Sequence, residues 1–107
     1  MMFGLSERTV ENICAVFARH PEVERVVVYG SRAKGNYKPG SDIDLTMQGP
    51  QLTRQLCATI DDELDDLLLP YSIDLSVFAE LHHPELEAHI ARVGQVFYQR
   101  GALCGCV

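Results

Sequence analysis

A run of β-branched residues constrains the fold of this chain more than any other feature of its sequence. Residues 23–29 read Val-Glu-Arg-Val-Val-Val-Tyr and stop at Gly30. Side chains that branch at Cβ favour strands, and a run this apolar is typical of a buried strand. A buried strand needs a sheet around it and helices to cover that sheet, so we expect a domain that contains both.

Three other segments are predicted to complete the sheet. Residues 41–48 form a second strand, which Gly49 and Pro50 break. Residues 71–78 form a third strand, and residues 95–98 add a short final one.

Three segments have the apolar spacing of amphipathic helices. The first follows Ser6, a favourable N-cap, and is stopped by Pro21. The second covers residues 51–68, and the third opens at Pro84 and closes at Gly94. Their apolar positions are Val10, Ile13, Cys14 and Phe17, then Leu52, Leu56, Ile60, Leu64 and Leu67, then Leu86, Ile90 and Val93.

The order of these elements predicts the fold class. It runs helix, strand, turn, strand, helix, strand, helix, strand, which indicates an α/β (or α+β) domain with a small mixed β-sheet and flanking helices. A chain of 107 residues has room for one core and little more. Residues 1–107 are therefore expected to form a single domain.

The composition is that of a soluble protein, and the cytoplasm is the expected compartment. No apolar run approaches the roughly 20 residues that cross a bilayer, so we expect no membrane contact. Residues 1–5 are too few and too uncharged for a signal peptide. In the cytosol all four cysteines are expected to be reduced thiols; they are Cys14, Cys57, Cys104 and Cys106.

The net charge of −6 argues against stable binding of nucleic acid, because proteins that bind its backbone usually carry the opposite sign. The same charge is compatible with binding one nucleotide, since Mg²⁺ can bridge acidic side chains to phosphate. Among nucleic-acid chemistries, the composition therefore favours a nucleotide over a polynucleotide ligand.

The turn after the first strand has features of a phosphate site. Gly30 allows the backbone to turn sharply and to approach a ligand closely. Residues 31–34 could begin a short helix, whose free N–H groups would face phosphates together with the Ser31 hydroxyl.

Positive charge is concentrated in the same segment. Both lysines of the chain, Lys34 and Lys38, lie here with Arg32, and no acidic residue falls between Gly30 and Ser41. An anionic ligand would suit this island of charge in an acidic protein. Taken alone, the pattern indicates a solvated basic loop equally well.

Asp42 and Asp44 stand two residues apart on a predicted strand, so both carboxylates should leave the same face. Their Cα atoms would be roughly 6.5–7 Å apart, which lets the side chains converge on cations. Ile43 and Leu45 would face the core. The alternative is an exposed strand face with incidental acids, because two aspartates at this spacing are by themselves a weak signal.

Asp74 is the third carboxylate of interest. It stands within Ile-Asp-Leu-Ser-Val, where Ile73 and Leu75 should face the core and Asp74 the opposite side. If its strand lies beside the strand of Asp42 and Asp44, three carboxylates meet at one place. Hard oxygen ligands at that density select Mg²⁺ or Mn²⁺.

These pieces together resemble a known signature. Gly30-Ser31 with Gly35, followed by Ser41-Asp42-Ile43-Asp44-Leu45, is similar to the G-S-x-x-x-G…S-D-x-D-L motif of the DNA polymerase β-like nucleotidyltransferases. Asp74 matches the third carboxylate of that superfamily by position. The resemblance extends over essentially the whole chain and is strongest to the minimal nucleotidyltransferases, so it implies the polymerase β-like nucleotidyltransferase fold.

The resemblance also implies roles for individual residues. Three carboxylates would be catalytic and would ligate two Mg²⁺ ions, with Mn²⁺ as the other candidate metal. The third of them would also help to activate an acceptor hydroxyl. Five residues would bind ATP or another nucleoside triphosphate. The carboxylates are Asp42, Asp44 and Asp74, and the nucleotide-binding residues are Gly30, Ser31, Arg32, Lys34 and Ser41.

The implied reaction is transfer of a nucleotide, AMP from ATP, to a hydroxyl acceptor. Larger relatives carry a further domain that holds the acceptor, and this chain ends at Val107 without one. Minimal nucleotidyltransferases are often paired with helical toxins of the HEPN class, so we expect such a toxin as acceptor and the chain as its antitoxin. The alternatives are a binding module that neutralises its partner without catalysis and, more weakly, a fragment of an antibiotic-modifying enzyme.

A cluster of acids crowds the second half of the predicted helix 51–68. Like charges four residues apart destabilise a helix by roughly 0.2–0.5 kcal/mol per pair. A solvated face that keeps the protein soluble is the preferred interpretation, and a docking face for a basic partner is the alternative. The cluster comprises Asp61, Asp62, Glu63, Asp65 and Asp66.

Overall fold

The computed structural model describes residues 5–30, 35 and 42–100. Helices and strands follow one another in the predicted order. The elements are α1 (Glu7–Ala18), β1 (Arg25–Tyr29), β2 (Ile43–Gln48), α3 (Arg54–Asp65), β3 (Ile73–Val77), the 3-10 helix η1 (Phe78–Glu80), α4 (Pro84–Val93) and β4 (Gln95–Gln99).

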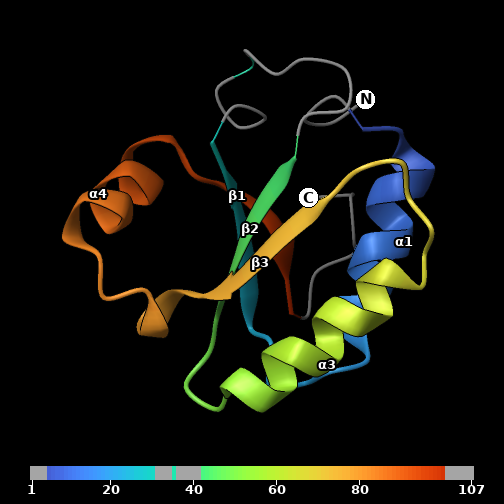
Figure 1. Cartoon of the computed structure of the whole chain (residues 1–107), viewed down its shortest axis with the longest axis horizontal. Helices are drawn as coiled ribbons and strands as arrows, with labels where there is room; N and C mark the ends of the chain where they lie inside the picture. The colour runs from blue at the N-terminus through green and yellow to red at the C-terminus, as the bar shows by residue number, and fades with distance from the viewer. Residues whose placement is uncertain (1–4, 31–34, 36–41, 101–107) are drawn as a thin grey trace.

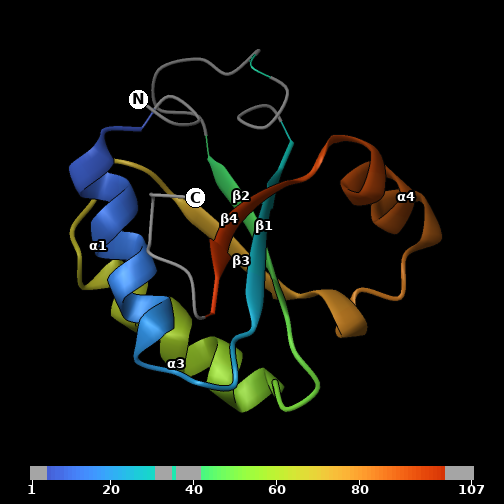
Figure 2. The same ribbon diagram turned by 180° about the vertical axis from the view of Figure 1, so that it is seen from behind.

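The strands form one mixed sheet in the order β3-β2-β1-β4. β1 is antiparallel to β2 and to β4, whereas β2 and β3 are parallel. The parallel pair is possible because α3 carries the chain back between the two strands. Helices α1 and α3 cover one face of the sheet, and α4 lies on the other (Figures 1 and 2). The predicted fold class, an α/β domain with a small mixed sheet, is confirmed.

The pleat of β2 sends alternate residues to two different environments. Ile43, Leu45 and Met47 are fully buried in the main core, which α1 and α3 complete. Asp44 and Thr46 face the other side, where a smaller apolar cluster forms under α4. That cluster consists of Val27, Tyr29 and Ile90, with Phe78, Leu81 and Leu86 packed against it.

Side-chain caps decide where the helices begin. The Ser6 hydroxyl accepts a hydrogen bond from the Thr9 amide at 3.2 Å, as predicted. Thr53 caps α3 in the same way through the Leu56 amide at 3.1 Å, so α3 starts later than the predicted residue 51. The longest helices have 12 residues, and no helix in the described ranges is long and apolar enough to cross a membrane.

Several predicted strand boundaries are wrong by one or two residues. β1 begins at Arg25 and β3 at Ile73, each two residues later than predicted, and β4 ends one residue later, at Gln99. β2 begins at Ile43, so Asp42 immediately precedes the strand and is exposed. The reason is the partner strand: β3 begins at Ile73, which pairs with Ile43, and no ladder continues beyond that pair. At the other end of β3 the chain turns into η1 at Phe78, one residue earlier than the predicted strand end.

The cysteines of the described part differ in state. Cys57 is a half-buried free thiol on α3, whose sulfur donates to the Leu75 carbonyl at 3.9 Å. Cys14 is fully buried, as its apolar position predicted, but it is disulfide-bonded, and Cys104 and Cys106 are outside the described residues. The prediction of a reduced thiol is therefore wrong for Cys14, because sequence spacing carries no information on which sulfurs meet across a fold.

Candidate functional site

Asp44 and Asp74 are direct neighbours in the sheet. They pair with each other across the parallel strands β2 and β3, and Asp44 pairs with Tyr29 across the antiparallel strands β1 and β2. Neighbouring strands lie roughly 4.8 Å apart, so the three side chains form one short row across the sheet. The row lies at the end of the sheet where β1 finishes and β2 and β3 begin. The sequence predicted that these carboxylates meet only if β2 and β3 are neighbours, and the structure shows that they are.

The environment of Asp44 disfavours its charge. Burial raises the pKa of its carboxyl above the usual range, and the negative charges of Asp74 and then Asp42 raise it further. A charge on His89 acts in the opposite direction. Asp44 is half-buried, whereas Asp42 and Asp74 are exposed. Asp42 therefore stays within electrostatic reach of the pair although it lies just outside the strand.

Glycine is favoured at position 30 by the backbone conformation and by the nearby Asp44 side chain. Its φ angle of +75° lies in the left-handed region that favours glycine. A Cβ atom at Gly30 would collide with the Asp44 carboxylate. Gly35 also has a positive φ of +85°, but no atom lies within 4 Å of where its Cβ would be. The sequence predicted that the backbone at Gly30 would closely approach a ligand. In the structure, the group that it approaches is the Asp44 carboxylate.

Tyr29 belongs to this row and His89 lies beside it, and neither was predicted as a site residue from the sequence. Tyr29 is 7% exposed, and burial raises the pKa of its phenol. A side-chain hydrogen bond to Ser76 opposes that shift, while Asp74 and Asp44 add to it. The His89 ring of α4 meets the Tyr29 ring edge to face, with centroids 6.5 Å apart and planes at 81°. The place of Tyr29 directly before Gly30 was a usable signal, but His89 had none.

The structure does not describe four of the five predicted nucleotide-binding residues, and the described residues do not form a complete metal site. Ser31, Arg32, Lys34 and Ser41 lie outside the described residues, so their assignment stays a prediction. Within residues 5–30, 35 and 42–100, no group of three or more His, Cys, Asp or Glu side chains is arranged to hold a metal ion. The oxygen ligands that the described row itself offers are a pair of carboxylates, with Asp42 nearby.

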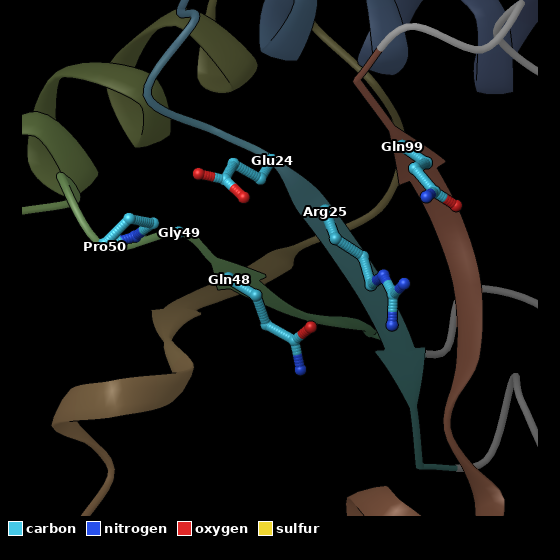
Figure 3. Close-up of a pocket in the computed structure, with 6 residues that line it drawn as sticks. All are labelled: Glu24, Arg25, Gln48, Gly49, Pro50 and Gln99. Carbon is cyan, nitrogen blue, oxygen red and sulfur yellow. The ribbon is translucent and has the colours of Figure 1, made fainter.

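A polar cavity of about 270 Å³ lies at the opposite end of β1. Arg25 pairs with Gln48 on one side and with Gln99 on the other, and Figure 3 shows its side chain between theirs. None of the residues predicted as catalytic or nucleotide-binding lines this cavity, so it is separate from the carboxylate row. Its lining residues are Glu24, Arg25, Gln48, Gly49, Pro50 and Gln99.

The acidic cluster of α3 does not form one uniform face. Glu63 contacts the two residues that follow α1, since its carboxylate lies 3.0 Å from the His20 ring nitrogen and 3.5 Å from the Arg19 guanidinium. Burial raises the pKa of Asp61, and neighbouring acids, Asp65 first, raise it further. The solvated-face interpretation fits the members that are exposed, which are Asp62, Asp65 and Asp66.

Several solved structures of similar fold are toxin–antitoxin structures. A toxin–antitoxin structure with AMP-PNP aligns with a TM-score of 0.68 and 17% identity over 91% of this chain and 76% of that one. The MntA-HepT toxin–antitoxin aligns at 0.66 and 14%, over 88% and 73%. A complex of the tri-AMPylated Shewanella oneidensis HEPN toxin with its MNT antitoxin aligns at 0.66 and 14%, over 89% and 73%. At such identities the likeness shows a shared fold.

Sequence comparison is decisive for the family. A search of curated protein sequences found no match. The family model described as polymerase beta, nucleotidyltransferase matches residues 11–102, which include β1, β2 and β3 with the whole carboxylate row. The protein therefore belongs to the polymerase beta nucleotidyltransferase family.

Proposed function

We propose that this protein is a Mg²⁺-dependent nucleotidyltransferase that moves AMP from ATP to a hydroxyl group on a HEPN-type toxin and thereby acts as an antitoxin. One observation carries the catalytic part of the proposal. Asp44 and Asp74 are paired across two neighbouring strands. At the same end of the sheet, the absence of a side chain on Gly30 leaves room for the Asp44 carboxylate. Family membership supports the same class of reaction.

The carboxylates suit a divalent cation by their chemistry. Two like charges side by side in a sheet destabilise the fold unless a cation or a proton offsets them. Asp42, Asp44 and Asp74 would ligate Mg²⁺ through hard oxygen atoms. Bound Mg²⁺ would stabilise negative charge on the α-phosphate and on pyrophosphate. Asp74, which is exposed, would accept the proton of the acceptor hydroxyl at a carboxylate oxygen.

The segment after β1 would hold the triphosphate. Gly30 has a left-handed backbone conformation and lies directly beside the Asp44 carboxylate. Backbone N–H groups, hydroxyls and basic side chains are the donors that phosphate oxygens accept from. We assign this role to Gly30, Ser31, Arg32, Lys34 and Ser41.

The partner and the nucleotide rest on the structural neighbours. One neighbour is a toxin–antitoxin structure with AMP-PNP, and another contains a tri-AMPylated HEPN toxin. Both share the fold of this chain at 14–17% identity. They support ATP as the nucleotide, AMP as the transferred group and a HEPN-type protein as the acceptor.

A transfer assay tests the proposal. The protein, Mg²⁺ and the product of the adjacent gene are incubated in parallel with ATP labelled at the α- or the γ-phosphate. Label from α-phosphate alone should appear on the partner, which identifies AMP transfer. Asp44→Asn should abolish it, whereas Asp66→Asn, an exposed acid at the end of α3, should not. Absence of transfer from every nucleoside triphosphate would contradict the proposal.

Neutralisation without catalysis is the competing function, and a cell assay separates the two. Cells that express the partner toxin receive either the wild-type protein or the double variant Asp42→Asn/Asp44→Asn. The proposal predicts rescue by the wild type alone. Full rescue by the double variant would show that complex formation is sufficient.

A further inference from the structure

We propose that His89 is a nucleotide-binding residue, whose imidazole donates a hydrogen bond to a phosphate oxygen of the bound nucleoside triphosphate. The inference rests on the proposed function and extends it to α4, a helix to which the sequence assigned no role in the site.

The packing of α4 brings His89 to the carboxylate row. α4 lies on the sheet face that carries Asp44, opposite to α1 and α3 (Figures 1 and 2). Ile90 anchors the helix in a cluster with Val27 and Tyr29. The neighbouring His89 ring then stands edge to face with Tyr29, the residue that pairs with Asp44. Its imidazole is therefore held at the end of the sheet where the phosphates are expected.

Within the described part of the chain, the ring nitrogens of His89 have no hydrogen-bond partner. Two other histidines in the described part use a ring nitrogen in a structural hydrogen bond. His20 contacts Glu63, and His83 caps α4 by accepting from the Leu86 amide. No hydrogen bond among the described residues engages the half-buried ring of His89. Because a polar group withdrawn from water is stabilised by a partner, this ring gains from a ligand that accepts a hydrogen bond.

The charges around His89 favour phosphate as that ligand. The imidazole is close enough to Asp44 to favour the charged carboxylate, so it lies within reach of the groups that would hold Mg²⁺. A triphosphate placed beside three acids needs donors as well as cations to offset its charge. Imidazole keeps at least one N–H donor whether it is neutral or protonated.

Substitutions can separate hydrogen bonding from packing. His89→Phe keeps an aromatic ring against Tyr29 but removes both nitrogens, whereas His89→Gln removes the ring but keeps a donor near the place of Nε2. The affinity of each variant for Mg²⁺ with AMP-PNP is measured by titration calorimetry, and the melting temperature is measured without ligand. His89→Met serves as a second variant without a donor in case His89→Phe does not fold.

The two variants should differ in their affinity for the nucleotide. His89→Phe should raise the Kd by about ten- to hundredfold, the range for one hydrogen bond to a charged group. It should leave the melting temperature near that of the wild type, and His89→Gln should keep the Kd within about threefold. Wild-type affinity in a folded donor-free variant would overturn the inference. A Kd raised equally in His89→Gln would also overturn it, because the ring alone would then matter.

The same experiment distinguishes failure of the proposed function from failure of the role of His89. If the wild-type protein shows no binding of Mg²⁺ with AMP-PNP, nucleotide binding itself is refuted. If the wild type binds and His89→Phe binds equally well, the proposed function stands and the role of His89 is refuted.

Discussion

The two faces of the sheet differ in what they contribute to this protein. On the face covered by α1 and α3, β2 places Ile43, Leu45 and Met47 at zero exposure among other apolar side chains. On the face that α4 covers in part, the same strand places Asp44 and Thr46. The first face stabilises the fold by removing apolar surface from water. The second carries groups that oppose folding.

Two groups on the second face show this opposition. The pKa of Asp44 is raised, chiefly by burial and then by Asp74, which means that the folded state disfavours its charged form. Thr46 is fully buried, and its hydroxyl oxygen has no hydrogen-bond partner in the described structure. Because the pleat separates the two faces, substitutions on neighbouring residues of β2 should have opposite effects on stability.

The largest effect is expected on the apolar face. Leu45→Ala removes a fully buried side chain from the main core and should lower the free energy of unfolding by about 2–5 kcal/mol. Urea unfolding followed by circular dichroism measures this loss. A loss well under 1 kcal/mol would mean that this face does not provide the main stabilisation, and the contrast between the faces would be wrong.

Substitution of Gly30 tests whether the contact between its backbone and the Asp44 carboxylate affects stability. Gly30→Ala should lower the free energy of unfolding by about 2–3 kcal/mol, because a positive φ strains alanine and its Cβ displaces the Asp44 carboxylate. Gly35→Ala is the matched control: φ is also positive, but the space is open, so strain alone should cost about 1–2 kcal/mol. Equal losses in the two variants would show that the contact with Asp44 has no energetic effect.

Thr46 should respond in the opposite sense to Leu45. Thr46→Val keeps the shape of the side chain and removes the hydroxyl that lacks a partner, so the free energy of unfolding should rise by about 1 kcal/mol. Thr46→Ser, which keeps the hydroxyl and loses the methyl group, should reduce it. If Thr46→Val destabilises the protein, the hydroxyl has a partner such as an ordered water.

The smallest effect concerns Asp44 and pH. The folded state binds the Asp44 proton more tightly than the unfolded state, because the folded pKa is raised. Stability from this group is therefore present below the ordinary pKa of aspartate and is lost as pH rises through the raised, folded pKa. Asp44→Asn should remove that loss, so without ligand it should be at least as stable as the wild type at neutral pH. Melts of both proteins at several pH values measure the difference, and a wild-type advantage that grows with pH would contradict the assignment.

Much of the fold follows from local signals in the sequence. The β-branched run before Gly30 predicted β1, and the Ser6 cap predicted the start of α1. The alternation around Asp44 and around Asp74 predicted which side of each strand would face the main core. Even the meeting of these two acids, thirty residues apart in sequence, needed one condition only, which was that their strands pair.

The remainder depended on tertiary contacts that no local pattern encodes. Asp42 lies outside β2 because a strand extends only as far as its partner does. The start of α3 was set by the Thr53 cap within a longer apolar pattern. His89 joined the site because α4 packs on β1 across sixty residues of sequence, and the histidine has no spacing that would indicate it.

The central claim is that Asp44 belongs to a cation and nucleotide site, and a thermal melt with and without Mg-ATP tests it most directly. Ligand that binds only the folded state at a hundredfold excess over Kd stabilises by about 2.7 kcal/mol. For a domain of this size that corresponds to a rise in Tm of order 10–20 °C. The wild type should show this rise, and Asp44→Asn should fold and melt without it. A wild type that shows no rise at saturating ligand, or an Asp44→Asn variant that keeps the full rise, would contradict the account.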